Sequence, residues 1–270
     1  MATSTITLRD GRRLCVDDVG DPRGRPVLYV HGTPDSRRAR HPDDSTAMDA
    51  GTRLLAVDRP GAGGSDVDPD GTVGSFADDI AELADHVGIR SMGVLAWSAG
   101  ALHGLAVAAR HPALVSRVGI AAGLPPVAAY RAPGILDGAS DDRRMVAELA
   151  AEMTPAELGA LLAPMVAPWP CDIELATAHV MEGADEVRRA ELDAVPGAVA
   201  AMAAGVVDAV AAGLAGLEHD IALQVTPPDI DLVGVTCPVR LWYGELDRTA
   251  PPTFGHWFAA HLPSTTLDVV

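Results

Sequence analysis

The feature that most constrains the fold of this chain is a series of short apolar runs separated by polar or helical stretches. The runs lack the alternation of a strand with one face in water, so they are typical of parallel strands buried on both faces. Apolar residues recur at helical spacing over about 75–87 and 99–110. The apolar runs are 26–30, 53–57, 92–96 and 115–121. Strand and helix alternate, which predicts an α/β fold with a doubly wound, mostly parallel sheet.

The second half of the chain departs from this alternation. Residues 124–229 are alanine-rich helical segments interrupted by prolines. The other strands and the last helix are predicted at 4–9 and 13–19, a hairpin around Asp10-Gly11, and at 239–243, 252–261 and 265–270. We therefore predict a core of residues 1–123 and 230–270, with 124–229 inserted as a helical cap over the carboxyl ends of the strands, where open α/β sheets bind ligands.

Composition narrows the classes of partner. Asp and Glu number 37 against 20 Lys and Arg, a net charge of -17, which argues against nucleic-acid binding. Cys15, Cys171 and Cys237 are scattered and have no paired spacing, so we expect neither a disulfide framework nor a zinc site, and no cofactor. The N-terminus lacks the features of a leader and no stretch is apolar enough to cross a bilayer. A cytoplasmic protein that acts on a small molecule is expected.

Ser98 is the candidate nucleophile. It lies in Ala96-Trp97-Ser98-Ala99-Gly100, between an apolar run and a helical pattern. A serine at a sharp strand-to-helix turn is held clear of the sheet, and small residues on both sides allow the turn to form. The backbone N–H groups at the start of a helix favour negative charge that develops there.

A second motif follows the apolar run at 26–30. Acyl transfer needs two donors for the oxyanion, normally the N–H after the nucleophile and one from the loop after the neighbouring strand. Within His31-Gly32-Thr33-Pro34 and the Ser98 turn, Thr33 and Ala99 fit these roles. We expect His31 to brace its loop through hydrogen bonds rather than to act as a base.

Two further motifs also follow apolar runs. Residues 58–65 contain glycines that allow a tight turn, and we expect Asp58 and Arg59 to hold this turn by ion pairing. Asp247, after the strand at 239–243, is the candidate acid that orients a catalytic histidine, with Glu245 as the alternative.

The motifs HGTPD, DRPGAGGS, AWSAG and YGELD occur in the order and approximate spacing of α/β-hydrolase-fold enzymes, and the chain resembles the bacterial serine hydrolases of that superfamily that carry a helical cap. The resemblance covers 20–270 apart from the cap. It implies a Ser–His–Asp mechanism, with Ser98 as nucleophile, Asp247 as the orienting acid and backbone donors at Thr33 and Ala99.

The histidine is the missing part of this arrangement. The resemblance places the base in a loop after the final strand, and the sequence ends at Val270, within that strand. Five of the nine histidines, namely His41, His86, His111, His179 and His219, are expected in loops or helix ends. His103 is more than a turn into the helix after Ser98, and His256 and His261 lie on a helix beside the sheet. Three explanations stay open: a natural tail follows Val270, which we favour, the base has been lost, or His179 or His219 substitutes from the cap.

The sequence thus favours hydrolysis of a small hydrophobic ester through an acyl-enzyme on Ser98, with Trp97 as a candidate substrate-binding residue. A non-hydrolytic enzyme on the same fold is the first alternative, because an oxyanion site also stabilises an enolate in proton transfer, cyclisation or elimination. A ligand-binding protein with an incomplete triad is the second.

Overall fold

The computed structural model describes residues 2–182, 184 and 186–270 and contains an eight-stranded sheet in the order β1-β2-β4-β3-β5-β6-β7-β8. β1 and β2 form an antiparallel hairpin, β2 also pairs antiparallel with β4, and the other neighbours are parallel. The strands are β1 Ala2–Thr7, β2 Arg13–Gly20, β3 Arg25–Val30, β4 Thr52–Val57, β5 Met92–Trp97, β6 Val115–Ala121, β7 Val239–Tyr243 and β8 Thr265–Val269. The predicted mostly parallel sheet is confirmed.

Helices cover the sheet and bury its central strands. Leu28 of β3, Leu55 of β4 and Ile120 of β6 are 0–1% exposed. α2 packs on α3, and α3 contacts β3, β5 and β6, while α10 contacts β7 and β8. These helices are α1 Ser45–Asp49, α2 Val73–His86, α3 Gly100–Arg110 and α10 Pro252–His261. Only the short α1 was not predicted.

The N-terminal end of α2 shows how the sequence sets a helix boundary. The Thr72 side chain accepts a hydrogen bond from the backbone N–H of Ser75, and the Ser75 hydroxyl lies 2.8 Å from the Thr72 nitrogen, which completes a capping box. From there Phe76, Ile80 and Leu83 recur at helical spacing and are almost fully buried. α2 therefore presents one apolar face to the core.

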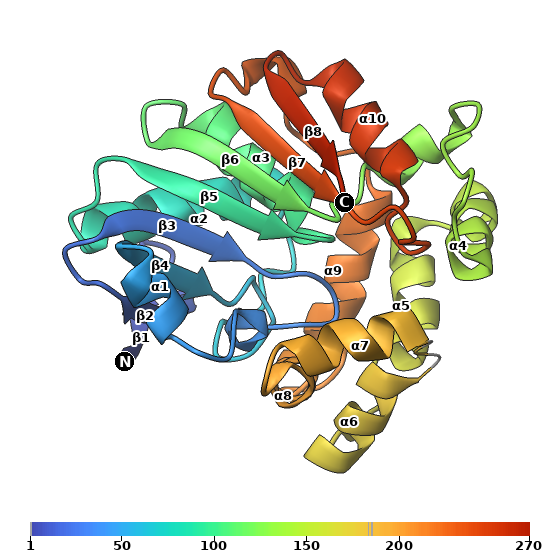
Figure 1. The fold of residues 1–270 in the computed structure, drawn as a ribbon, viewed down its shortest axis with the longest axis horizontal. Coiled ribbons are helices and arrows are strands. Elements are labelled where there is room, and N and C mark those ends of the chain that lie inside the picture. The colour runs from blue at the N-terminus through green and yellow to red at the C-terminus, as the bar shows by residue number, and fades with distance from the viewer. Residues whose placement is uncertain (1, 183, 185) are drawn as a thin grey trace.

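Between β6 and β7 the described residues form helices and no strand. They are α4 Asp141–Glu152, α5 Pro155–Val166, α6 Ile173–Met181, α7 Glu186–Ala194, α8 Ala198–Ala209 and α9 Ala215–Val225, and we call α4 to α9 the helical segment. Its apolar core, which includes Leu158, Leu162, Val206, Leu217 and Ile221, is separate from that of the sheet. Figure 1 shows these helices beyond the arrowheads of the parallel strands.

The register of the sheet brings the candidate residues to one edge. Val30 of β3 lies opposite Val57 of β4 and Ala96 of β5. His31, Asp58 and Ser98 are the first residues after β3, β4 and β5, respectively. The segments that carry the motifs therefore meet where the parallel strands end.

Among the described residues no single helix is both long enough and apolar enough to span a membrane, although α7 and α8 pass that test together as a pair bent by 96°.

Candidate active site

Ser98 occupies a strained turn between β5 and α3. Its φ is +52°, a left-handed conformation that is uncommon for residues other than glycine and costs on the order of 1–3 kcal/mol. The backbone nitrogen of Ser98 donates to the carbonyl oxygen of Ala121 (3.0 Å). The carbonyl oxygen of Ser98 accepts from the backbone nitrogens of Ala101 and Leu124, each at 3.1 Å. Because strain of this kind persists only where surrounding contacts impose it, the turn is a specific feature of this sequence.

Close backbone approach brings the loop after β3 next to this turn. A Cβ on Gly100 would lie 2.5 Å from the oxygen of His31, and one on Gly32 would lie 3.1 Å from the Cβ of Ser98. Gly100 therefore allows α3 to begin against β3, and any larger side chain would push the two apart. The predicted neighbourhood of Ser98 and the His31–Pro34 loop is present.

Thr33 and Ala99 line one cavity beside Ser98. Within the described ranges, no hydrogen-bond partner is recorded for the backbone N–H of either residue. Ala99 is also the N-terminal cap of α3, where the helix dipole favours an anion. Two unpaired donors beside a strained serine have the chemistry of an oxyanion site.

The side chain of Thr33 is held by the helical segment. Its hydroxyl donates to the carboxylate of Asp220 and accepts from Nη2 of Arg59 (2.8 Å) and Nε2 of Gln224 (3.1 Å). Asp220 and Gln224 are four residues apart on α9, so they lie on the same side of that helix. Sequence reasoning missed both residues, and their i,i+4 spacing was the signal available.

Arg59 joins this network to the loop backbone. Its side chain is 3% exposed, pairs with Asp220 and donates to the oxygen of Gly32 at 2.7 Å. Burial, the largest single effect, would raise the pKa of Asp220, but the charges of Arg59 and His103 and the hydrogen bonds from Thr33 and Arg59 together hold that pKa below its ordinary value. The carboxylate is therefore ionised and paired at neutral pH.

His31 braces two loops, as predicted. Nδ1 lies 2.8 Å from the oxygen of Gly32, and Nε2 accepts from the backbone nitrogen of Arg59 at 3.0 Å. Burial, reinforced by the charge of Arg59, lowers the pKa of His31 well below its ordinary value. With both ring nitrogens engaged, the neutral imidazole has no lone pair left to serve as a base.

Asp58 and Arg59 do hold their turn by ion pairs, but not with each other. Asp58 is fully buried and accepts from Nη1 of Arg37 at 2.6 Å and from the nitrogen of Gly64 at 2.8 Å. Arg59 pairs with Asp220 instead. Consecutive side chains after a strand point in different directions, so their partners come from separate elements.

Asp247 lies in the loop after β7. Its Oδ1 accepts from the nitrogens of Thr249 (2.8 Å) and Ala250 (2.9 Å). Glu245 is exposed, and its nitrogen donates to the oxygen of Val270 at 2.8 Å. The described residues show no hydrogen bond between Asp247 and a histidine, so the role of Asp247 as an orienting acid stays a prediction.

In the described ranges no hydrogen bond joins a histidine to Ser98 or Asp247. His103 is buried with its Nδ1 unpartnered, it packs edge-on against Phe76, and burial lowers its pKa to about 3. His219 was expected at a loop or helix end, but it is half-buried inside α9, and its Nε2 lies 3.2 Å from the oxygen of Gly71.

The remaining histidines face other partners or solvent. Nδ1 of His179 lies 3.7 Å from Glu182, and Nε2 of His111 lies 2.9 Å from Asp78. His41, His86, His256 and His261 are exposed. None of the described histidines is therefore hydrogen-bonded to Ser98 as the expected catalytic base would be.

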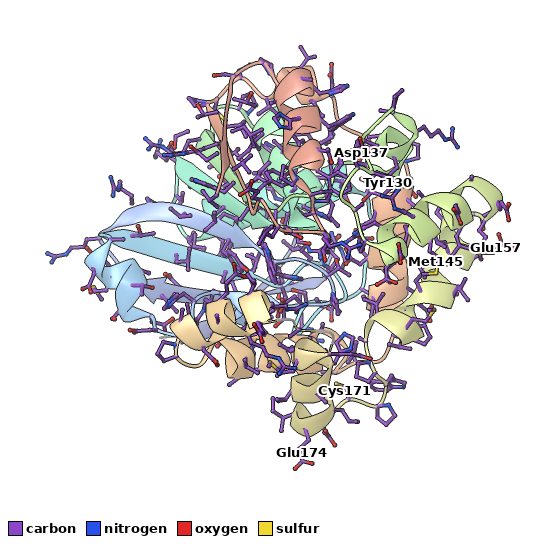
Figure 2. The ribbon with its side chains drawn as sticks, turned by 45° about the vertical axis from the view of Figure 1, so that its right-hand side comes forward. Tyr130, Asp137, Met145, Glu157, Cys171 and Glu174 are labelled. Atoms are coloured by element: carbon purple, nitrogen blue, oxygen red, sulfur yellow. The ribbon has the colours of Figure 1, made fainter. Side chains whose placement is uncertain are left out.

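The cavity has a volume of about 100 Å³. A single water needs on the order of 10–15 Å³ of such space, so it holds several small groups but no long chain. Core and helical segment both contribute to its wall, which comprises Thr33, Ala99, Leu102, Leu124, Pro125, Val127, Tyr130, Arg143, Val146, Leu162, Val166, Ile221, Gln224 and Val225. Figure 2 shows Tyr130 where the helical segment meets the core.

Trp97 is not part of that wall. Its ring lies against Gly32, at a distance of 3.5 Å from a Cβ built there, because the residue before the turn still belongs to β5. Its proposed contact with substrate has no support from the cavity. No group of three or more His, Cys, Asp or Glu among the described residues is arranged to hold a metal ion.

Comparisons with known proteins agree with this architecture. A family model described as alpha/beta hydrolase fold matches residues 25–146. A non-heme chloroperoxidase of Kitasatospora aureofaciens is 37% identical over 95 residues, which are 35% of this chain and 34% of that protein. A haloalkane dehalogenase of Mycolicibacterium paratuberculosis is 31% identical over 133 residues, 47% of this chain and 44% of that protein. The match thus spans less than half the length of either curated relative.

One solved structure extends the likeness to the whole chain. An alpha/beta hydrolase fold protein from Nakamurella multipartita superposes with a TM-score of 0.64 at 26% identity, and the match covers 99% of this chain and 90% of that one. The sheet order, the strained serine between β5 and α3, and these matches lead to one assignment. The chain has the α/β-hydrolase fold.

Proposed function

We propose that the protein is a serine hydrolase that cleaves a small ester or related acyl substrate through an acyl-enzyme on Ser98. The observation that carries the proposal is the strained Ser98 turn beside the two unpaired backbone N–H groups of Thr33 and Ala99. An arrangement of this kind is suited to a reaction in which a nucleophile attacks a carbonyl and its oxygen becomes an anion.

In the proposed reaction the Ser98 oxygen attacks the substrate carbonyl and passes its proton to a histidine base oriented by Asp247. The N–H groups of Thr33 and Ala99 stabilise the tetrahedral oxyanion, which collapses as the alcohol leaves with that proton. Water then attacks the acyl-enzyme and gives one proton to the base, which passes it to the Ser98 oxygen as the acid is released.

The helical segment has the role of a lid in this proposal. Five of its residues supply an apolar part of the cavity wall: Val146, Leu162, Val166, Ile221 and Val225. An apolar cover excludes water from the acyl group and strengthens the hydrogen bonds to the oxyanion. The size and lining of the cavity favour a short acyl chain.

Covalent labelling tests the proposal. We expect a fluorophosphonate probe to label the protein expressed from its complete reading frame at one site, and Ser98→Ala to lose the label. Ser91→Ala removes an exposed serine before β5 and serves as the matched control that keeps it. Absence of labelling, or equal labelling of Ser98→Ala, would refute the proposal.

A second candidate is non-hydrolytic chemistry at the same oxyanion site. Two observations favour non-hydrolytic chemistry. The N–H groups of Thr33 and Ala99 are unpaired among the described residues, and no hydrogen bond joins Ser98 to a described histidine. An enolate needs the two donors but no activated serine. This candidate predicts that Ser98→Ala retains turnover of a substrate with an acidic C–H beside a carbonyl, followed by exchange of that hydrogen in D₂O.

A further inference from the structure

Arg143 gives the cavity a positive charge that nothing in the hydrolytic mechanism uses. It lies in the first turn of α4. Among the described wall residues it is the one charged side chain, in a protein with nearly twice as many acidic as basic residues. The cavity is otherwise lined by apolar and neutral polar groups, so this guanidinium is exceptional there.

No carboxylate among the described residues forms an ion pair with Arg143. Its Nε donates to the oxygen of Thr249 at 2.9 Å, and the described part of the chain shows no ion pair to it within 4.0 Å. By contrast, three arginines whose side chains are largely buried, Arg12, Arg37 and Arg59, all pair with aspartates. Figure 2 shows Glu157 and Glu174 at the outer rim of the helical segment, and both are exposed.

Tyr130 adds a second donor beside Arg143. Its side chain is buried, its ring stacks on Phe254 with centroids 5.2 Å apart, and it lines the same cavity. Burial raises the pKa of Tyr130, with a smaller opposing effect of Arg143, so the phenol keeps its proton at neutral pH. The end of the cavity formed by these two residues thus offers hydrogen-bond donors.

A guanidinium stays protonated at any physiological pH. Arg143 is half-buried at the cavity wall, so its charge attracts an anion that enters the cavity. A carboxylate matches its planar array of N–H groups. We propose that the acyl part of the substrate ends in a carboxylate that binds Arg143 and Tyr130, while the scissile carbonyl lies at Thr33 and Ala99. This rests on the proposed function and narrows its substrate to short half-esters of dicarboxylic acids or lactones that carry a carboxylate.

Two esters of similar length test the inference. We expect the wild type to hydrolyse mono-p-nitrophenyl glutarate with a kcat/KM at least 10-fold above that for p-nitrophenyl butyrate, after spontaneous hydrolysis is subtracted. Arg143→Gln should lower kcat/KM for the glutarate ester by roughly 10- to 100-fold, the range for hydrogen bonds to a charged group, and so abolish the preference. Arg143→Lys should restore part of it.

Arg144→Gln is the matched control. Arg144 is the next residue on α4, is exposed, and donates to the oxygen of Leu136 at 2.8 Å. We expect this variant to keep the wild-type preference for the charged ester. An equal loss in both variants would mean that the charge acts at long range, and an equal rate for both esters in the wild type would overturn the inference.

Binding without turnover separates this inference from the proposed function. Calorimetry of Ser98→Ala should detect monomethyl glutarate but bind methyl butyrate at least 10-fold more weakly, and Arg143→Gln in that background should remove the difference. If the wild type hydrolyses neither ester, the proposed function fails, and the calorimetric preference alone decides the role of Arg143. Equal binding of both probes would refute that role.

Discussion

The pair of Arg59 and Asp220 gives the sharpest prediction for stability. The two side chains are 3% and 15% exposed, and the pair links the core to α9. Asp220→Asn keeps the shape of the side chain and removes its charge, which leaves Arg59 buried without a counterion. Loss of one partner of a buried pair costs about 3–5 kcal/mol. Because asparagine can still accept a hydrogen bond, we expect the free energy of unfolding to fall by about 3 kcal/mol.

Urea denaturation at pH 7 measures this change, and Asp78→Asn is the matched control. Asp78 pairs with Arg110 between α2 and α3, but their side chains are 48% and 43% exposed, so this variant should lose at most about 1 kcal/mol. The pKa of Asp220 lies below its ordinary value in the folded protein, so its contribution is present above pH 3.8 and is lost as pH falls further. Equal losses for the two variants at pH 7 would refute the claim that the Arg59–Asp220 pair is desolvated.

Three further predictions concern the packing and the buried titratable groups. Gly205→Ala should lower the free energy of unfolding by about 1–3 kcal/mol because its Cβ would lie 1.9 Å from Oδ1 of Asp35, whereas Gly234→Ala, with its nearest neighbour at 3.6 Å, should change it by less than about 1 kcal/mol. The pKa of His103 is lowered to about 3, so between pH 8 and pH 5 the wild type should lose about 2 kcal/mol that His103→Leu does not lose, and parallel pH profiles would contradict this. Burial raises the pKa of Asp35 well above its ordinary value, so ionisation of this carboxyl lowers the stability of the folded protein as pH rises. Asp35→Asn should therefore resist urea better than the wild type at pH 7. A less stable variant would show that the folded protein stabilises the Asp35 carboxylate.

The sheet could be predicted from the sequence because its strands carry a local signal. β3, β4 and β5 begin and end within one residue of the apolar runs, since strands buried on both faces must be apolar throughout. The helix after the loop at 244–251 was placed at its observed bounds, Pro252–His261. In contrast, α1 has five residues and no buried side chain, so it leaves no apolar periodicity in the sequence.

The candidate site was predictable only on the core side. Ser98, Thr33 and Ala99 follow strands, and strand register alone brings the segments that carry them together. Asp220 and Arg143 belong to helices whose position over the sheet depends on contacts between residues far apart in the chain. Asp220 is 161 residues from its partner Arg59, and no local pattern encodes such a pairing.

The two charges that the helical segment brings to the site have different consequences for how it can open. α9 supplies Asp220 and Gln224 to Thr33, and it also supplies Ile221 and Val225 to the cavity wall. Movement of α9 away from the core would therefore separate the buried ion pair and release the loop that carries Thr33. α4 carries Arg143, which has no carboxylate partner among the described residues. Arg143 donates to the oxygen of Thr249, and Ser140, the N-terminal cap of α4, donates through its backbone nitrogen to the oxygen of Arg248. Displacement of α4 breaks hydrogen bonds but no ion pair among the described residues, so an opening that leaves the contacts of Thr33 intact is less costly on the side of α4.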